Sequence, residues 1–371
     1  MKTTMKTIAS ISFTALLVAC SDGGTAPAAL DDGTLSDAAV ESGETTVSME
    51  AGSNGTLNIY SARHYDSDKL MYEAFEDQTG IRVRFREAGA NQLLETMRAE
   101  GENSPADLII ASDAGALWRF KDAGLTQPLP EGEFEQHIPE RLIEPGRQWV
   151  GLARRIRGVA YDPERISPDQ VDEWQDLADP SLEGEICVRS STNIYNLSLM
   201  AEMIEKWGAE DAQSWADAVV ANMARTPQGG DTDQVEAVAA GLCSVAITNH
   251  YYWVRMTQSG SDATREAAAA TKLAFPSFGE GEGIHVNITG VAMAANAQNN
   301  DEAMQFVDYL LSADGQHRLV DETKEIPVIE DVTWPQGLDA IPEFEDSDTP
   351  LDTFGERQSQ AQRIYDEAGW N

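Results

Sequence analysis

The sequence is poor in basic residues. Its 371 residues include 26 Lys and Arg against 63 Asp and Glu, which gives a formal net charge of −37. A chain this acidic is repelled by nucleic acid and by anionic membrane surfaces, so both are excluded as partners of its folded body. Most of these charges belong to a solvated surface, and they suit a saline environment or a cationic ligand.

Cysteine and histidine are also scarce, with three and five residues respectively. A zinc or copper site would require more of them. The sequence contains no G-x-S-x-G, no H-E-x-x-H and no Walker loop, and no nucleophile has a recognisable base nearby. We therefore predict that the protein is not an enzyme.

The N-terminal apolar segment, Ile8 to Ala19, is too short to span a bilayer. It follows Lys2 and Lys6 and is typical of a secretory signal. Its end, Leu17-Val18-Ala19-Cys20, resembles the lipobox of bacterial lipoproteins, which predicts a lipoprotein signal peptide over residues 1–20 and a lipidated Cys20. Ordinary cleavage near Ala19 is the alternative.

Residues 21–53 contain seven acidic residues, no Lys or Arg, and otherwise mostly small residues. This composition predicts a disordered acidic tether. Together with the lipid anchor, it would hold a soluble body near a membrane without burying any of that body.

The remaining chain alternates between predicted strands and helices, which favours parallel sheets. The alternation restarts after residue 149, and the chain is long enough for two domains. Two long extended runs, 151–162 and 284–295, are candidates for strands that cross between the domains and form a hinge. The predicted strands are 57–60, 81–85, 106–110, 185–189 and 245–247, and the predicted helices include 93–100, 113–123, 171–178, 194–207, 211–224, 301–312 and 358–368. Asp66 or Ser67 is predicted to cap the first helix, and the segment from Asp231 to Gln234 a later one.

Cys187 and Cys243 each lie on or beside a predicted strand of the second domain. Because a secreted location permits oxidation, we predict a disulfide between them. Two separate buried thiols are the alternative, since the sequence does not show whether their Cα atoms are close enough.

Tyrosines in polar turns follow three predicted strands, and Tyr251 and Tyr252 are adjacent. Adjacent residues can share one target only where a strand has ended, and ligands of open α/β sheets bind at such strand ends. An aromatic core cluster is the alternative, which the polar flanking residues weaken. The three turns are Arg63-His64-Tyr65-Asp66, Ser190-Ser191-Thr192-Asn193-Ile194-Tyr195-Asn196 and Asn249-His250-Tyr251-Tyr252.

A phenol ionises near pH 10, so several phenols gathered in one site require a strong cation that displaces their protons. Ferric iron fits this requirement because it is a hard, highly charged ion that prefers anionic oxygen ligands.

These residues resemble a family, the periplasmic ferric-iron-binding proteins of bacterial ABC transporters. The resemblance covers roughly residues 55–371, and its motifs occur in the family's order. Val286-Asn287-Ile288-Thr289-Gly290 is similar to the family's second hinge strand. The other motifs are Ile59-Tyr60-Ser61-Ala62-Arg63-His64-Tyr65-Asp66, Arg189-Ser190-Ser191-Thr192-Asn193-Ile194-Tyr195-Asn196, Asp231-Thr232-Asp233-Gln234 and Asn249-His250-Tyr251-Tyr252.

The resemblance implies a type II periplasmic-binding-protein fold in the α/β class, with two lobes, mainly parallel sheets covered by helices on both faces, and a two-strand hinge. We expect lobe 1 to comprise residues 54–155 and 285–325, and lobe 2 to comprise residues 156–284 and 326–371.

The resemblance also implies the metal ligands. Tyr251 and Tyr252 match the family's tandem ferric ligands, Tyr65 and Tyr195 match further phenolate ligands of its tyrosine-rich branch, and His64 matches a position that coordinates iron in some members only. Around them, Arg63, Arg189, Arg255 and Asn249 are expected to balance the charge of the phenolates.

Another branch of the family uses a glutamate ligand and a bound anion. Here the corresponding loop is Ser112-Asp113-Ala114-Gly115, without a glutamate, and Asp231 puts a negative charge where that branch tends to have a neutral polar residue. Both departures put an anion co-ligand in doubt.

The predicted function is that of a monomeric extracytoplasmic receptor, located in the periplasm and lipid-anchored to the membrane. It would deliver Fe³⁺, free or as a small ferric chelate, to an ABC transporter permease. Two alternatives stay open: a binding protein of the same fold for a small organic or inorganic anion, and an iron-tyrosinate hydrolase. A hydrolase needs an open coordination position, whereas four phenolates and a histidine nearly fill an iron.

Overall fold

The computed structural model describes residues 55–63, 65–330 and 332–371. The predicted signal peptide, Cys20, the tether over residues 21–53 and His64 lie outside these residues. Within the described part of the chain, no helix is both long and apolar enough to cross a membrane.

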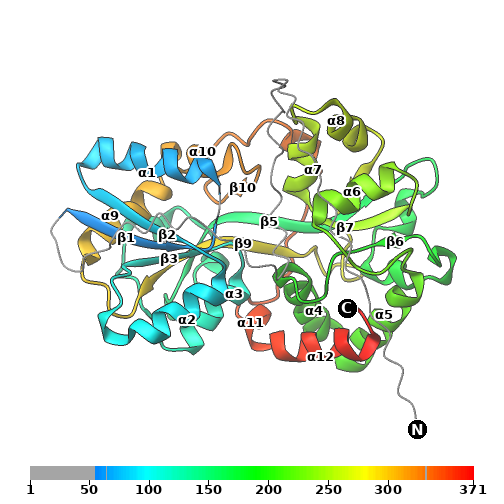
Figure 1. The fold of residues 1–371 in the computed structure, drawn as a ribbon, viewed down its shortest axis with the longest axis horizontal. Coiled ribbons are helices and arrows are strands. Elements are labelled where there is room, and N and C mark those ends of the chain that lie inside the picture. Colours follow the sequence, from blue (N-terminus) through cyan, green and yellow to red (C-terminus); the bar gives the residue numbers. More distant parts are fainter. Residues whose placement is uncertain (1–54, 64, 331) are drawn as a thin grey trace, which may run out of the picture. The chain divides into compact units, whose positions relative to one another are not determined.

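Strands and helices alternate along the chain, as the sequence predicts (Figure 1). The strands are β1 (Thr56–Ser61), β2 (Arg82–Glu87), β3 (Leu108–Ala111), β4 (Thr126–Gln127), β5 (Val150–Tyr161), β6 (Ile186–Cys187), β7 (Val245–Asn249), β8 (Lys272–Ala274), β9 (Val286–Ala294) and β10 (Ile326–Pro327). The helices are α1 (Asp66–Thr79), α2 (Ala90–Glu100), α3 (Ala114–Asp122), α4 (Ile194–Trp207), α5 (Ala209–Asn222), α6 (Asp231–Ala239), α7 (His250–Thr257), α8 (Asp262–Ala269), α9 (Asn300–Leu310), α10 (Ala313–Val320), α11 (Thr353–Glu356) and α12 (Gln358–Ala368).

The strands form one sheet path in the order β2-β1-β3-β9-β5-β7-β6. Parallel pairing is confined to its two ends, where β1 lies between β2 and β3, and β6 lies beside β7. The two predicted crossing strands, β5 and β9, pair antiparallel with each other and link the two ends. Sequence reasoning expected two separate sheets; the crossing strands instead join them into one path.

Two large hydrophobic cores flank the crossing strands. The first core is built from the apolar residues of β1, β3 and the helices α1, α2, α3, α9 and α10. The second core is built from β7, α4, α5 and α12. Figure 1 shows α1 and α10 on one face of the first group of strands and α2 and α3 on the other. This is the α/β arrangement that the sequence predicts.

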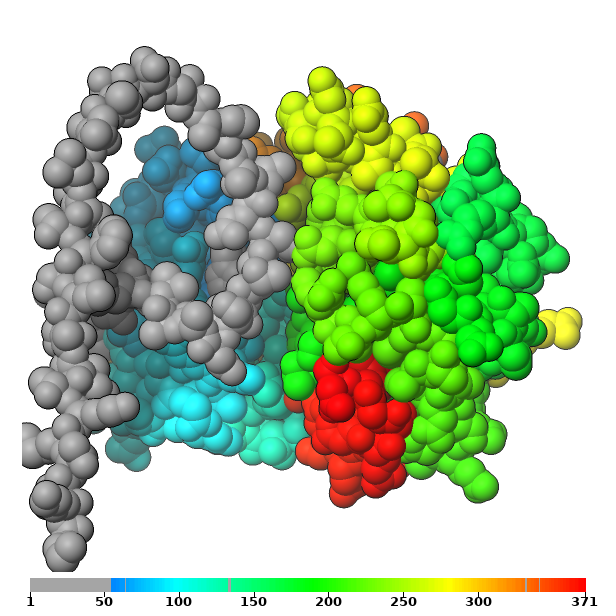
Figure 2. Space-filling view, turned by 45° about the vertical axis from the view of Figure 1, so that its right-hand side comes forward, coloured from blue at the N-terminus to red at the C-terminus, as the bar shows by residue number. Residues whose placement is uncertain are grey.

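The C-terminal segment contributes to both cores. Val328 and Phe354 pack in the first core, whereas Ile364 and Tyr365 of α12 pack in the second. α12 lies against α4 and α5, and Figure 2 shows the end of the chain, in red, packed against the green middle of the chain. The boundary between the lobes in this segment stays a prediction.

Two helix caps and one predicted helix differ from the prediction, apart from shifts of one to three residues at other helix ends. Tyr65, with extended backbone angles, is the N-cap of α1, so Asp66 is already helical and its charge favours the first turn. Likewise, Gly230 is the N-cap of α6, which begins at Asp231. The segment predicted as a helix over 171–178 contains only a short 3₁₀ helix, Trp174–Ala178. Gly80 ends α1 as expected, with a φ of 74° that favours glycine.

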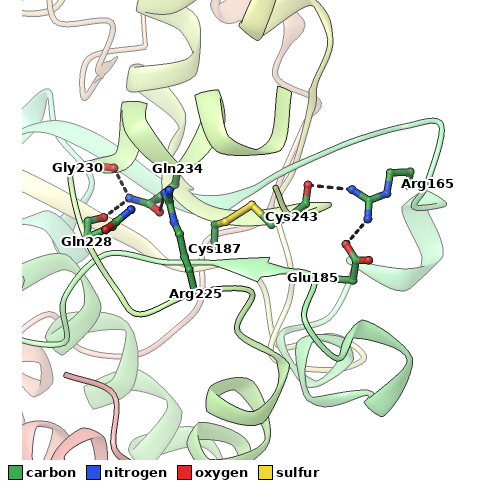
Figure 3. Close-up of a disulfide and its surroundings, with 8 residues drawn as sticks. All are labelled: Arg165, Glu185, Cys187, Arg225, Gln228, Gly230, Gln234 and Cys243. Carbon is green, nitrogen blue, oxygen red and sulfur yellow. Dashed lines mark hydrogen bonds and ion pairs between the residues drawn. A yellow bond between two sulfur atoms is a disulfide. The ribbon is translucent and has the colours of Figure 1, made fainter. Parts of the chain in front are cut away.

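The structure contains the predicted disulfide between Cys187 in β6 and Cys243, which precedes β7 (Figure 3). Their Cα atoms are 6.0 Å apart, and both side chains are fully buried. Beside it, the Arg165 guanidinium donates to the Cys243 carbonyl at 3.2 Å and pairs with Glu185 (Figure 3). The bond ties the two parallel strands at this end of the sheet together.

Candidate functional site

All four candidate tyrosines lie where the chain passes into a helix. Tyr65 caps α1, Tyr195 is in the first turn of α4, and Tyr251 and Tyr252 are in the first turn of α7, directly after β7. At α4 the turn is fixed by Asn193, whose side chain accepts from the Tyr195 amide at 3.0 Å. The rings of Tyr251 and Tyr252 are 4.5 Å apart, so the break between β7 and α7 does let adjacent phenols lie together.

Arg155 connects Tyr195 with Tyr251. It extends from the crossing strand β5, donates to the Tyr251 hydroxyl, and lies 4.6 Å from the Tyr195 ring centre and 4.8 Å from the Tyr251 ring centre. Burial acts to raise the pKa of Tyr195, but the Arg155 guanidinium and a hydrogen bond with Tyr251 outweigh it and lower that pKa. Burial raises the pKa of Tyr251 well above its usual range.

Arg255 connects Tyr65 with Tyr252. Its guanidinium carbon lies 5.6 Å from the ring centre of each of these tyrosines. Burial, followed by the proximity of Tyr195 and Glu325, raises the pKa of Tyr65 to about 12. Tyr65 caps a helix of the first core and the other three tyrosines begin helices on the far side of the crossing strands, so the structure brings together all four predicted tyrosines.

Arg63 belongs to a buried chain of ion pairs beneath Tyr65. Its guanidinium is 3.0 Å from Asp68 and 2.9 Å from Glu325, and its carbon lies 5.1 Å from the Tyr65 ring centre. Glu325 in turn pairs with Arg155 at 3.2 Å. Burial opposes ionisation of Glu325, but Arg63 and Arg155 lower its pKa. This chain fixes both arginines against the rings that they contact.

Asp231 pairs with two further arginines near the tyrosines, as Glu325 does with Arg63 and Arg155. Its carboxylate accepts from Arg157 and Arg189, each at 3.1 Å, and from the Asn249 amide at 2.8 Å. Burial would raise the pKa of Asp231, yet the two guanidinium groups lower it. The Asn249 side chain then donates to the Tyr251 hydroxyl at 3.0 Å. Of the residues expected around the phenols, Arg63, Arg189, Arg255 and Asn249 all lie there.

Sequence reasoning missed Arg155, Arg157 and Glu325. Arg155 and Arg157 are two residues apart on β5, so they share one face of the strand. Two arginines on one face of a crossing strand whose only other charged residue is Arg154 are a signal that could have identified them. Glu325 carries no such signal, because it lies just before the short strand β10 and far along the chain from its partners.

His250 does not face the tyrosines as a free base. Its Nδ1 accepts from the Ile156 amide at 3.1 Å, and its Nε2 donates to the Lys324 carbonyl at 2.9 Å. Burial lowers its pKa to about 4. Within residues 55–371, apart from the two omitted positions, no cluster of three or more His, Cys, Asp and Glu side chains could hold a metal ion. Among the described residues, the tyrosine oxygens are therefore the candidate metal donors.

Two hollows in the structure differ in their relation to the tyrosines. A small polar cavity touches the site and is lined by Arg155, Arg157, Tyr195, Asn249, His285 and Asn287. A larger cleft of about 570 Å³ is lined by residues that include Trp253, Arg265 and Lys272 but none of the four tyrosines. Of these two hollows, the small cavity is the one that candidate residues line, through Tyr195 and Asn249 together with the Arg155 and Arg157 guanidinium groups.

Comparison with known proteins supports the same class of protein as the arrangement of the tyrosines. Residues 103–346 match the family described as bacterial extracellular solute-binding protein. Iron uptake protein A2 of Synechocystis is 39% identical over 316 residues, which cover 85% of this chain and 90% of that protein. The name of this relative is that of an uptake protein and not of an enzyme.

Two solved structures resemble the whole described body. The Trichodesmium protein FutA, or IdiA, in complex with iron and citrate has a TM-score of 0.81 and 36% identity, and the match covers 85% of this chain and 100% of that one. A ferric binding protein from Campylobacter jejuni has a TM-score of 0.80 and 35% identity, with coverage of 85% and 100%. These matches confirm the two-lobed fold class.

Proposed function

The chain belongs to the bacterial extracellular solute-binding protein family, and from this premise we propose that it captures ferric iron outside the cytoplasm and delivers it to an ABC transporter permease. In this proposal, the phenolate oxygens of Tyr65, Tyr195, Tyr251 and Tyr252 hold the ion between two lobes.

The observation that carries the proposal is the sharing of two arginines among four phenols, of which Tyr251 and Tyr252 are buried and Tyr65 and Tyr195 are partly buried. Arg155 contacts Tyr195 and Tyr251, and Arg255 contacts the rings of Tyr65 and Tyr252. The raised pKa values of Tyr65 and Tyr251 mean that neither phenol ionises near neutral pH without help. A trivalent cation supplies that help, since it displaces the protons as it binds.

The buried charges around the site also suit ferric iron. Four guanidinium groups pair with three carboxylates, which leaves one positive charge in this network: Arg63, Arg155, Arg157 and Arg189 against Asp68, Glu325 and Asp231. Ferric iron with four phenolates carries one negative charge. The network therefore offsets the charge of the loaded site, and Arg255 adds a further positive charge beside it.

We assign His64 as an additional ligand, because it adjoins Tyr65 in the first motif. An anion co-ligand is not part of the proposal. The Asp231 carboxylate already accepts from both guanidinium groups on that side, so an added anion would compete with it. A small loss of ferric affinity in His64→Ala, compared with Tyr65→Phe, would remove His64 from the ligand set.

The cellular arrangement follows from the N-terminal segment. We propose that Cys20 is the lipidated first residue of a mature monomer that stays at the membrane through residues 21–53. Cys20→Ala should release the protein to the soluble fraction or block its processing. An unmodified mature terminus downstream of Cys20 would remove the anchor from the account.

We keep the proposed lobe boundaries, with residues 54–155 and 285–325 in lobe 1 and residues 156–284 and 326–371 in lobe 2. Their support is the division of α3 and α4 between the two cores, with β5 and β9 crossing between them; against the boundary at residue 326, Val328 and Phe354 pack in the first core.

The test is iron retention by purified mature protein after incubation with ferric citrate and gel filtration. We expect one iron per chain. A parallel incubation with citrate alone tests the main alternative, a binding protein for small anions. Retention of citrate without iron would favour that alternative and contradict the ferric proposal.

A further inference from the structure

A buried carboxylate joins the two lobes below the tyrosines. Asp113 is the N-cap of α3, a helix of the first core, and only 1% of it is exposed. It accepts from its own helix at the Gly115 amide, 2.8 Å away, and from the Asn287 side chain on the crossing strand β9, also at 2.8 Å. The third donor is the Ser198 hydroxyl, 2.9 Å from Oδ1, which comes from α4 in the second core.

Asp113 forms no salt bridge with a described residue, so its direct partners are hydrogen-bond donors, and Arg155 favours its ionised form only from a greater distance. A buried carboxylate that loses a donor carries a large desolvation penalty, because water does not reach it. Burial also raises the pKa of Asp113, and the Ser198 hydroxyl is the main group that opposes this rise. The carboxylate therefore depends on Ser198, and Ser198 reaches it only while α4 lies against α3.

Ser198 is also tied to the tyrosines through its own helix. Tyr195, Ser198 and Glu202 are spaced three and four residues apart, so they lie along one face of α4. Tyr195 faces Arg155, Ser198 bonds to Asp113, and Glu202 pairs with His285 just before β9. Tyr195, Ser198 and Glu202 thus form a row of polar side chains on α4 that faces the crossing strands, with Tyr195 at one end.

Close to Asp113, the helices α3 and α11 approach each other so closely that only glycine fits at two positions. A Cβ at Gly115 would lie 2.9 Å from the Phe354 carbonyl, and one at Gly355 would lie 2.4 Å from Trp118. α3 and α11 are therefore in close contact, and α11 also lies against α4. Because Asp113 is on α3 and Ser198 is on α4, their hydrogen bond would break if the two lobes separated.

We propose that Asp113 and Ser198 form an interlobe latch, a pair of positioning residues that sets ferric affinity by holding α4 and its Tyr195 against the first lobe. This inference rests on the proposed ferric function. None of the hydrogen bonds of Asp113 goes to a tyrosine. The latch acts through closure, because only the closed arrangement places Tyr65 with the other three phenols.

The main test compares Ser198→Ala with the parent and with a matched control, Ser214→Ala, which removes an exposed helix serine from α5. A hydrogen bond to a charged group corresponds to about a tenfold or larger change in affinity. We expect Ser198→Ala to bind ferric iron about tenfold more weakly, mainly through faster dissociation, and Ser214→Ala to match the parent. Equal ferric affinity in all three proteins would overturn the latch.

A swap variant separates the latch from a general loss of stability. In Asp113→Asn, the new side-chain NH₂ group faces the NH₂ group of Asn287, so two donors meet and the hydrogen bond is lost. We therefore expect ferric affinity to fall. In Asp113→Asn with Asn287→Asp, the donor and acceptor are exchanged while the bond and the total charge are kept. Recovery of most of the lost affinity supports the latch, and an equal or larger loss in the double variant rejects it.

Small-angle scattering of the metal-free proteins gives a measurement that does not depend on iron. We expect a larger radius of gyration for Ser198→Ala than for the parent and Ser214→Ala, because the open arrangement gains population. If the parent fails to bind ferric iron, the proposed function fails, and this comparison alone decides the latch. Equal radii would then reject it.

Discussion

Single residues at the site act as charge-matched pairs rather than as isolated ligands. Each phenol contacts an arginine, and four of these arginines are held in place by a buried carboxylate: Glu325 holds Arg63 and Arg155, and Asp231 holds Arg157 and Arg189. A buried ion pair of this kind is weak evidence for stability, but it fixes the direction in which the arginine side chain points. The arginines are therefore positioned before the metal arrives, which limits the reorganisation that binding requires.

Substitution of Asp231 tests whether the buried carboxylates hold these arginines in place. Its two arginine partners lower its pKa, so its contribution to stability is present above the unfolded value near 3.8 and is lost as the pH falls through the folded value. Asp231→Asn should lose about 3–5 kcal/mol at pH 7, because two buried guanidinium groups lose their counter-charge. It should also lose less stability than the parent between pH 4 and pH 2. Urea unfolding against pH measures both effects, and parallel curves for the two proteins would contradict them.

At the scale of elements, the site depends on where strands end. β7 ends at Asn249 and α7 begins at once, so Tyr251 and Tyr252 leave the sheet on the same side. The disulfide fixes the neighbouring strand, since it joins β6 to the residue two positions before β7.

Removing the disulfide should weaken the second lobe. Cys187 and Cys243 are 56 residues apart, and closing a loop of that size contributes about 4 kcal/mol in the chain-entropy model. Cys187→Ser with Cys243→Ser should lower the free energy of unfolding by about that amount, measured in urea. Loss of less than about 1 kcal/mol would show that the packing of β6 against β7 suffices without the bond.

The sequence allowed prediction of elements whose signal is local. Gly80 and Asp113 mark helix ends, and the polar turn after residues 245–247 marks the tyrosine pair. It did not allow prediction of Glu325 beside Arg63, because the two are 262 residues apart and neither belongs to a motif with the other. The continuous sheet was missed for the same reason, since the pairing of β3 with β9 depends on the tertiary fold.

At the scale of the whole molecule, the proposed site is complete only when the two lobes close on the ion. Of the four candidate phenolates, Tyr65 is the one at the start of a helix of the first core, so in the proposed site the ion gains its full set of phenolates only when the lobes meet. A ligand shifts such an equilibrium by its differential affinity for the closed state. The described arrangement, in which Arg255 contacts both Tyr65 and Tyr252, is of this closed kind.

Tyr65→Phe should uncouple binding from closure. Three candidate phenolates remain in the second lobe, so the variant should still bind ferric iron, but more weakly than the parent. Iron should reduce the radius of gyration of the parent in small-angle scattering and leave that of Tyr65→Phe nearly unchanged. Equal compaction of both proteins would show that Tyr65 does not bridge the lobes.

The central claim, that phenolates hold ferric iron, is tested most directly by the visible absorbance of the protein during titration with ferric citrate. Phenolate bound to ferric iron absorbs visible light, whereas carboxylate and imidazole ligands alone give no such band. The matched control is Tyr309→Phe, which removes a hydroxyl with no hydrogen-bond partner in the first core. The comparison variants are Tyr251→Phe and Tyr252→Phe.

We expect a visible band that saturates at one iron per chain in the parent and in Tyr309→Phe. In Tyr251→Phe and Tyr252→Phe the band should weaken and shift, and ferric affinity should fall by more than the roughly 10–100-fold that loss of an outer-shell partner costs. Iron bound without a visible band, or an unchanged band in both variants, would contradict the account.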